Sequence, residues 1–248
     1  MKYAIITDIH EDIVNLRFAL NKIQKFKCDE IICLGDISGF SAPHYSYYDT
    51  RNASECLRLI RENCSIIISG NHDLHAARLT PKINPEFDYP ANWYQLDYNE
   101  RKLLSNDGVW LYEHDELSPL YTKHDIEYLK TLPELHLLKA DAKNILLSHY
   151  CFPNLTGSSR TFYNFIEDFE AHHNFMKQNN CHFSFTGHRH FAGLLIAGND
   201  NLIGLRLGKK HQLKNGDCVL VPAITGKRNG NGFCIYDSTT NSIESIRI

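Results

Sequence analysis

Five short blocks rich in histidine, aspartate and asparagine occur along the chain, each directly after an apolar run. They are Asp8-x-His10, Gly35-Asp36, Gly70-Asn71-His72-Asp73, His149 and Gly187-His188-Arg189-His190. Carboxylate, imidazole and amide groups together suit Mn, Fe, Zn or Ni better than Ca. Residues two apart at an extended chain end point to one face, so Asp8 and His10 can hold one ion, and His188 and His190 can reach toward one site. Because a carboxylate has two oxygens, Asp36 can bridge two ions.

Each block also has a simpler explanation when it is considered alone. Asp8 could cap a helix, Asp36 could be a turn residue, and His149 could be a satisfied core histidine. Considered together, the five blocks favour a shared metal site, because all five follow an apolar strand. Buried polar groups concentrated at one edge of a sheet are costly unless a cation organises them.

The elements that would position these blocks alternate between strands and helices. Apolar runs at 3–7, 31–34, 65–69, 144–148 and 182–186 predict buried strands, and 12–25, 54–63 and 165–178 predict helices. Short strands are predicted at 217–221, 232–236 and 242–248. This order predicts a layered α/β fold with the polar blocks at the carboxyl ends of strands, where ligands bind in open α/β sheets.

Residues 75–140 have a different composition, with five prolines, two tryptophans and helical pieces at 99–104 and 124–132. We therefore predict a single domain, 1–248, with a mainly helical cap inserted at about 75–140. Aromatic residues in and near this stretch could stack on a nucleobase or simply pack within the cap. They are Tyr45, Tyr47, Tyr48, Trp93 and Tyr94.

Charge and composition exclude several classes of function. Lys plus Arg number 26 and Asp plus Glu 29, a formal net charge of −3, which argues against an extended nucleic-acid surface. No run approaches the roughly 20 apolar residues that a membrane span needs. The N-terminal apolar run reaches Asp8 before a signal peptide could form, so we predict a cytoplasmic protein. None of the eight cysteines forms a CxxC pair, which favours reduced core thiols.

The blocks in this order, D-x-H, GD, GNHD, H and GHxH, resemble the calcineurin-like metallophosphoesterase superfamily. Within it, the chain is most similar to small bacterial phosphodiesterases of the YfcE type and to their longer diadenosine-tetraphosphatase-like relatives. Residues 35–40 resemble the GDIVGYG segment of that branch, 129–133 resemble its cap motif, and 225–230 are a weak version of its GSxGxPRDG segment. The resemblance implies two packed mixed β-sheets flanked by helices.

The resemblance also implies roles for individual residues. The first metal would be held by Asp8, His10, Asp36 and His190, and the second by Asp36, Asn71, His149 and His188. Both ions would preferably be Mn, with Fe, Zn or Ni as alternatives. A metal-activated hydroxide would attack phosphorus, with Asn71 helping to stabilise charge. His72 would donate a proton to the leaving group, and Asp73 would orient its ring.

The predicted function is a dinuclear metal-dependent phosphodiesterase acting on small phosphoesters, nucleotides among them. A phosphomonoesterase, including a protein Ser/Thr phosphatase, is the alternative within the enzyme class. A non-catalytic binding module of the same fold is a third hypothesis, which loss of ligands would favour; no ligand position is lost here, and His72 is present. No membrane contact is predicted, and the oligomeric state stays open.

Overall fold

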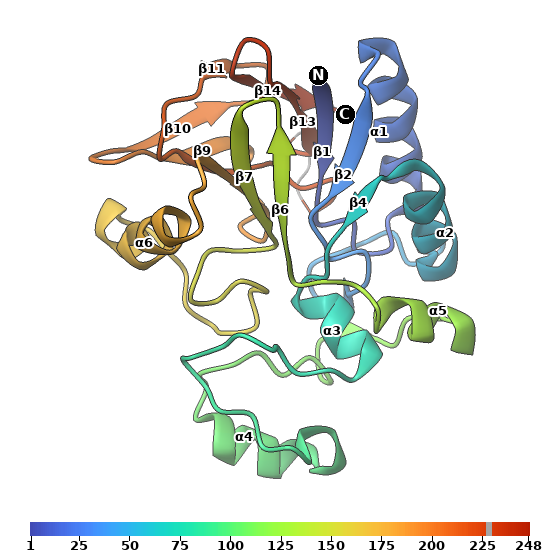
Figure 1. The fold of residues 1–248 in the computed structure, drawn as a ribbon. Coiled ribbons are helices and arrows are strands. Elements are labelled where there is room, and N and C mark those ends of the chain that lie inside the picture. The colour runs from blue at the N-terminus through green and yellow to red at the C-terminus, as the bar shows by residue number, and fades with distance from the viewer. Residues whose placement is uncertain (227–229) are drawn as a thin grey trace.

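Two six-stranded mixed sheets face each other and helices cover their outer faces (Figure 1). The computed structural model describes residues 1–226 and 230–248, so part of the predicted segment 225–230 lies outside the described residues. The first sheet has the order β11 (Lys210–Gln212), β14 (Ser242–Arg247), β13 (Gly232–Asp237), β1 (Lys2–Ile6), β2 (Glu30–Cys33), β4 (Ile66–Ile67). The second has the order β10 (Leu202–Arg206), β9 (Gly193–Ala197), β12 (Cys218–Leu220), β8 (Phe183–Thr186), β7 (Lys143–Ser148), β6 (Leu135–Ala140). The predicted α/β architecture is confirmed.

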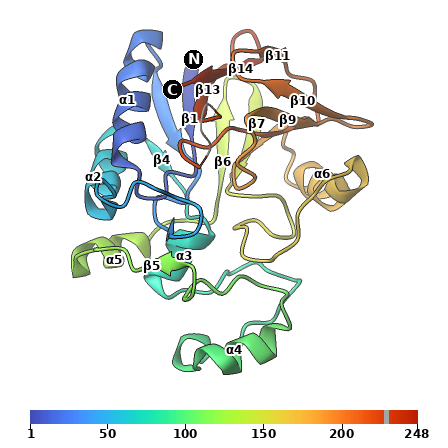
Figure 2. The ribbon, with the colours of Figure 1, turned by 180° about the vertical axis from the view of Figure 1, so that it is seen from behind.

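The helices divide between the two outer faces and the lower end of the molecule (Figures 1 and 2). Helices α1 (Ile13–Phe26) and α2 (Ala53–Asn63) cover the first sheet, and α6 (Glu170–Gln178) covers the second. Helices α3 (Asn71–Ala77), α4 (Tyr98–Ser105) and α5 (Lys123–Leu129) lie below the sheets. Two short 3-10 helices span Trp93–Gln95 and Ile166–Phe169. Among the described residues, no helix combines the length and apolar character needed to cross a membrane.

The pleat of the strands builds the core from alternating side chains. In β1, Tyr3 and Ile5 belong to the cluster between the sheets, whereas Ala4 and Ile6 pack with residues of α1 and α2. Successive side chains of a strand point to opposite faces, so a strand buried on both faces has the continuous apolar sequence seen here. All eight cysteines are free thiols, and six of them are buried.

The carboxyl ends of the parallel strands come together at one edge. Strands β1, β2 and β4 are parallel neighbours in the first sheet, and β7 and β8 in the second. The loops that follow them are tied by backbone hydrogen bonds: the amides of Ile9 and His10 both donate to the carbonyl of Asp36, at 2.8 and 3.0 Å. This edge faces α3 and the loops around α4 (Figure 1).

The stretch 75–140 contains several short elements besides α4 and α5. Strand β5 (Glu116–Leu117) pairs with β3 (Phe40–Ser41), which joins this stretch to the loop after β2. Strand β6 pairs with β7 in the second sheet, so residues 135–140 are part of the main framework. Helix α4 projects away from the sheets in both views (Figures 1 and 2).

Candidate metal centre

Side chains from all five polar blocks meet at the carboxyl edge of the two sheets. One group consists of Asp8, His10 and His190: His190 Nε2 lies 3.2 Å from Asp8 Oδ1 and 3.1 Å from His10 Nε2. A second group consists of Asp36, His149 and His188, with His149 Nε2 at 3.0 Å from Asp36 Oδ2. Within each group the ligand atoms lie within 4.8 Å of one another.

The two groups adjoin through the two aspartates. Asp8 Oδ1 is 3.8 Å from His149 Nε2, and Asp36 Oδ2 is 4.0 Å from His10 Nε2. Both carboxylates are fully buried. Burial by itself would raise the pKa of Asp36, but His149 and then His72 outweigh it and lower that pKa. The carboxylates are therefore ionised acceptors at the junction of two imidazole clusters.

Neighbouring groups fix which ligand atoms face the centre. Nδ1 of His10 lies 2.9 Å from the carbonyl of Gly39, and Nδ1 of His149 lies 2.7 Å from that of Leu34. Because a carbonyl only accepts, each Nδ1 is the donor and each Nε2 is directed to the centre. The amide nitrogen of Asn71 donates to the hydroxyl of Tyr112 at 2.8 Å, which leaves its Oδ1 free.

Two buried acceptors of the centre fit a cation. Asn71 Oδ1 and His188 Nε2 have no hydrogen-bond partner among the described residues. A buried polar atom without a partner costs about 1–3 kcal/mol. A divalent ion would satisfy both atoms, and imidazole nitrogen beside amide and carboxylate oxygen is the donor set of a transition metal. The residues present therefore fit the metal ions that the sequence predicted.

The backbone at the ligands has an unusual conformation. Five of the candidate ligands have a positive φ: Asp8 (52°), His10 (48°), Asp36 (53°), His188 (66°) and His190 (47°). For a residue with a Cβ this left-handed region costs about 1–2 kcal/mol. Such residues cluster at functional sites, where the surrounding structure holds them in place. Five of the thirteen non-glycine residues with a positive φ in the described part of the chain are thus candidate ligands.

Two glycines are required because the loops after β2 and β4 touch. A Cβ on Gly70 would lie 2.1 Å from Asp36 Oδ1, and one on Gly35, whose φ is +95°, would lie 2.4 Å from the nitrogen of Gly70. The backbone amide of His72 donates to the same Asp36 oxygen at 2.9 Å. Both glycines of the GD and GNHD blocks therefore serve the position of the Asp36 carboxylate.

The imidazole of His72 is held by Glu116, and the prediction that Asp73 orients it is wrong. Glu116 is in β5, and its Oε1 pairs with His72 Nδ1. The carboxylate of Asp73 instead accepts from the backbone amides of Ile37, Ser38 and Gly70 at 3.0, 2.9 and 3.1 Å. Adjacent residues on a helix point in different directions, so Asp73 anchors the loop after β2.

The pKa of His72 reflects its acidic surroundings. Burial would lower this pKa, but Glu116 and then Asp36 outweigh burial and raise it to about 10. The Nε2 atom of His72 lies 3.8 Å from Asp36 Oδ2, on the side of the candidate ligands. Glu116, a residue of the 75–140 stretch that the sequence did not indicate, therefore holds His72 at the centre and favours the protonated form of its imidazole.

A cavity of about 200 Å³ opens onto the centre, with aromatic walls. Phe162 stacks on His188 with ring centroids 5.5 Å apart, and Tyr45 lies 5.3 Å from His10. Of the aromatic residues considered in the sequence, Tyr45 lines this cavity. Trp93 is 3% exposed and packs against Phe87 and Tyr89, so packing within the insertion explains it.

Comparison with known proteins identifies the family of this site. Residues 1–192 match the family described as calcineurin-like phosphoesterase. The match spans most of the chain, and the chain therefore belongs to this family of metal-dependent phosphoesterases. The resemblance stated from the sequence motifs is confirmed.

Several proteins of known sequence or structure are similar to the chain at low identity. An uncharacterized protein of Methanocaldococcus jannaschii, MJ0912, is 23% identical over 254 residues, which cover 99% of this chain and 86% of that protein. A metallophosphoesterase from Sphaerobacter thermophilus has a TM-score of 0.67 and 18% identity, covering 100% of this chain and 88% of its own. The hypothetical protein PH1004 from Pyrococcus horikoshii OT3 has a TM-score of 0.62 and 16% identity, covering 100% and 87%. These structures share the fold.

Removing divalent metal should lower the thermal stability of the protein. Ions that bind only the folded chain stabilise it by about 2.7 kcal/mol at a hundred times their Kd. For a chain of this length that corresponds to a shift of about 5–11 °C in Tm. Differential scanning calorimetry with EDTA, and then with excess Mn²⁺, measures the shift. An identical Tm in both conditions, with no metal found by elemental analysis, would contradict the fit of the centre to a cation.

Proposed function

We propose that the protein is a phosphodiesterase that binds two divalent ions, preferably Mn²⁺. Its substrates would be small phosphodiesters, nucleotides among them. The observation that carries the proposal is the arrangement of two adjoining ligand groups with His72, paired with Glu116, beside them. The first ion would be held by Asp8, His10, Asp36 and His190, as the resemblance of the sequence motifs implies. The second would be held by Asp36, Asn71, His149 and His188.

Each group of side chains has a distinct task in this proposal. When bound, the ions would polarise a phosphoryl oxygen and lower the pKa of a water molecule. Asp36 would hold the two ions at a shared carboxylate. His72 would donate the proton on Nε2 to the departing oxygen, and Glu116 on Nδ1 would keep the ring in place. Asn71, anchored by Tyr112, would stabilise charge at the phosphoryl group.

A diester is favoured because the cavity has aromatic walls on both sides of the centre. Tyr45 lies beside the first ligand group and Phe162 beside the second, and Trp110 also lines the cavity. Organic groups on either side of a phosphate could contact these rings. A phosphomonoester carries only one organic group and would contact the aromatic rings on only one side of the centre. All candidate ligands and His72 are present, which favours an enzyme over a binding module.

A substrate panel joined to metal analysis tests the proposal. The protein purified with Mn²⁺ should bind two ions per chain and cleave bis-p-nitrophenyl phosphate faster than p-nitrophenyl phosphate. A preference for the monoester would support the phosphomonoesterase alternative. Binding of two ions with no turnover of any ester would support the binding module. The cytoplasmic location stays a prediction from the sequence.

Replacing Glu116 with Gln should slow turnover without removing metal. The substitution keeps the shape but removes the charge that holds His72, and loss of such a supporting partner typically costs about 10–100-fold in activity. Steady-state kinetics and metal analysis measure the two effects. Glu86→Gln is the matched control, since Glu86 is an exposed glutamate of the same insertion. Equal activities of the two variants would show that Glu116 does not position His72.

A further inference from the structure

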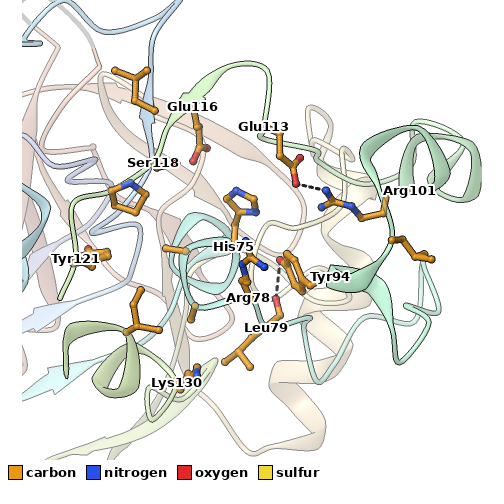
Figure 3. Close-up of a pocket in the computed structure, with 16 residues that line it drawn as sticks. His75, Arg78, Leu79, Tyr94, Arg101, Glu113, Glu116, Ser118, Tyr121 and Lys130 are labelled. Atoms are coloured by element: carbon orange, nitrogen blue, oxygen red, sulfur yellow. Dashed lines mark hydrogen bonds and ion pairs between the residues drawn. The ribbon is translucent and has the colours of Figure 1, made fainter. Parts of the chain in front are cut away.

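A second and larger cavity, of about 950 Å³, lies between α3, α5 and the loops of the insertion (Figure 3). Its walls include His75 and Arg78 from the end of α3, Tyr94, Arg101 from α4, and Lys130 after α5. Glu116 lines both this cavity and the cavity at the metal centre. The volume is in the range of about 300–1,000 Å³ that is usual for small-molecule sites. Apart from Glu116, the residues named here have no role in the proposed hydrolysis.

The charges on the walls favour an anion. Arg78, Arg101 and Lys130 bring three cations against two carboxylates, those of Glu113 and Glu116, so the walls carry one excess positive charge. Glu113 pairs with Arg101 at 2.5 Å, and Glu116 pairs with His72. The pair of Lys130 with Glu127 is exposed, and exposed pairs contribute little. The guanidinium of Arg78, which is exposed, has no ion pair among the described residues. Arg78 and Lys130 are therefore the cations that an anionic ligand would neutralise.

Arg101 provides a second, independent indication of a ligand. Its side chain is 9% exposed, and its Nε atom is buried with no hydrogen-bond partner among the described residues. The guanidinium lies over Trp93 and Tyr94, at 5.8 and 5.9 Å from the ring centroids. A buried N–H without an acceptor costs about 1–3 kcal/mol. In Figure 3 the Arg101 side chain extends from α4 toward Glu113 at the cavity.

Apolar and aromatic side chains form the rest of the cavity wall. Leu79, Leu117 and Ile126 are apolar, and Tyr94 and Tyr121 offer rings. The ligand that fits this wall carries an anionic group together with an aromatic or apolar one. We propose that the cavity is a second binding site, separate from the metal centre, for a nucleoside phosphate: the phosphates would contact Arg78, Arg101 and Lys130, and the base would lie against Tyr94.

Several residues that line the cavity also contact residues of the metal centre, so a ligand bound in the cavity would affect turnover. Glu116 holds His72. The hydroxyl of Tyr121 is 2.9 Å from Ser38 Oγ, in the loop after β2. His75 packs on Tyr112, at 4.6 Å between ring centroids, and Tyr112 anchors Asn71. A ligand that moves these walls would change kcat without competing with the substrate.

Binding of ADP tests the site, with Mn²⁺ in excess over ADP in every sample. Calorimetry should give a Kd that stays within about twofold in Asp36→Asn and weakens by at least about tenfold, or 1.4 kcal/mol, in Arg78→Glu. Arg206→Glu, at an exposed arginine of β10, is the matched control and should bind like the wild type. Because a nucleotide could also bind at the metal centre, the two arginine variants are compared in the Asp36→Asn background, so the result does not depend on the proposed function.

Two outcomes would overturn the proposal. ADP binding that is lost in Asp36→Asn and intact in Arg78→Glu would place the ligand at the metal centre. The wild type could also show no saturable ADP binding up to about 1 mM ADP, which corresponds to a binding free energy weaker than about −4.1 kcal/mol. That result would show that the cavity does not bind nucleoside phosphates. In kinetics with bis-p-nitrophenyl phosphate, ADP should change kcat in the wild type and not in Arg78→Glu. An ADP effect confined to KM and kept in Arg78→Glu would equally contradict a second site.

Discussion

The Asp36→Asn variant should lose bound metal and turnover together. The Asp36 carboxylate is fully buried between the two candidate ligand groups, 3.0 Å from His149 and 4.0 Å from His10. The amide would leave two ions without the anion between them. Loss of several kcal/mol of electrostatic stabilisation corresponds to a fall of about 10³-fold or more in kcat/KM.

Elemental analysis and steady-state kinetics measure the two losses. Asp88→Asn is the matched control, because it makes the same change at an exposed aspartate of the insertion. Circular dichroism checks that Asp36→Asn is folded, since its carboxylate also accepts from the backbone of His72. A folded variant that binds two ions per chain and turns over like the wild type would show that Asp36 does not bridge the ions.

The His72→Asn variant should lose activity in proportion to how strongly the leaving group needs a proton. General acid catalysis contributes typically about 10²–10⁴-fold. p-Nitrophenolate leaves readily without protonation, whereas a ribose or alkyl alkoxide does not. We therefore expect a large loss of kcat/KM on nucleotide or alkyl esters, a much smaller loss on p-nitrophenyl esters, and two retained ions.

Measuring kcat/KM over esters of graded leaving-group pKa distinguishes the roles open to His72. Equal losses across the series, with metal retained, would show that His72 stabilises charge on the phosphoryl group. Loss of metal would make it a ligand, as the grouping of His72 with His10 and Asp36 allows. The Glu116→Gln variant should show the same dependence on the leaving group in weaker form, because Glu116 acts through His72.

The sequence was informative about the centre because each polar block is local. A buried apolar strand followed by Gly-Asp or Gly-Asn-His-Asp can be identified within about ten residues, and parallel strands bring such ends to one edge. The positive φ of Asp8, His10, Asp36, His188 and His190 leaves no such local signal, because contacts between loops impose it.

The residues contributed by the insertion could not be predicted in the same way. Glu116 follows His114 and Asp115 in a polar stretch, and only the pairing of β5 with β3 brings it to His72. Tyr112 reaches Asn71 by the same tertiary route. For Asp73, adjacency in sequence suggested a contact that the geometry of α3 prevents. Local patterns therefore predicted the candidate ligands, while their supporting partners depend on the path of the insertion.

The distance along the chain between the ligands has a consequence during protein synthesis. His10 and His190 meet at 3.1 Å although 180 positions separate them, and the first ligand group needs both. The second group needs strands from both sheets. A chain emerging from the ribosome N-terminus first can offer only incomplete sets of ligands until residue 190 is made and β8 has paired with β7. The complete ligand groups therefore form only after most of the chain has been made, and a shorter nascent chain offers Asp8, His10 and Asp36 without His188 and His190.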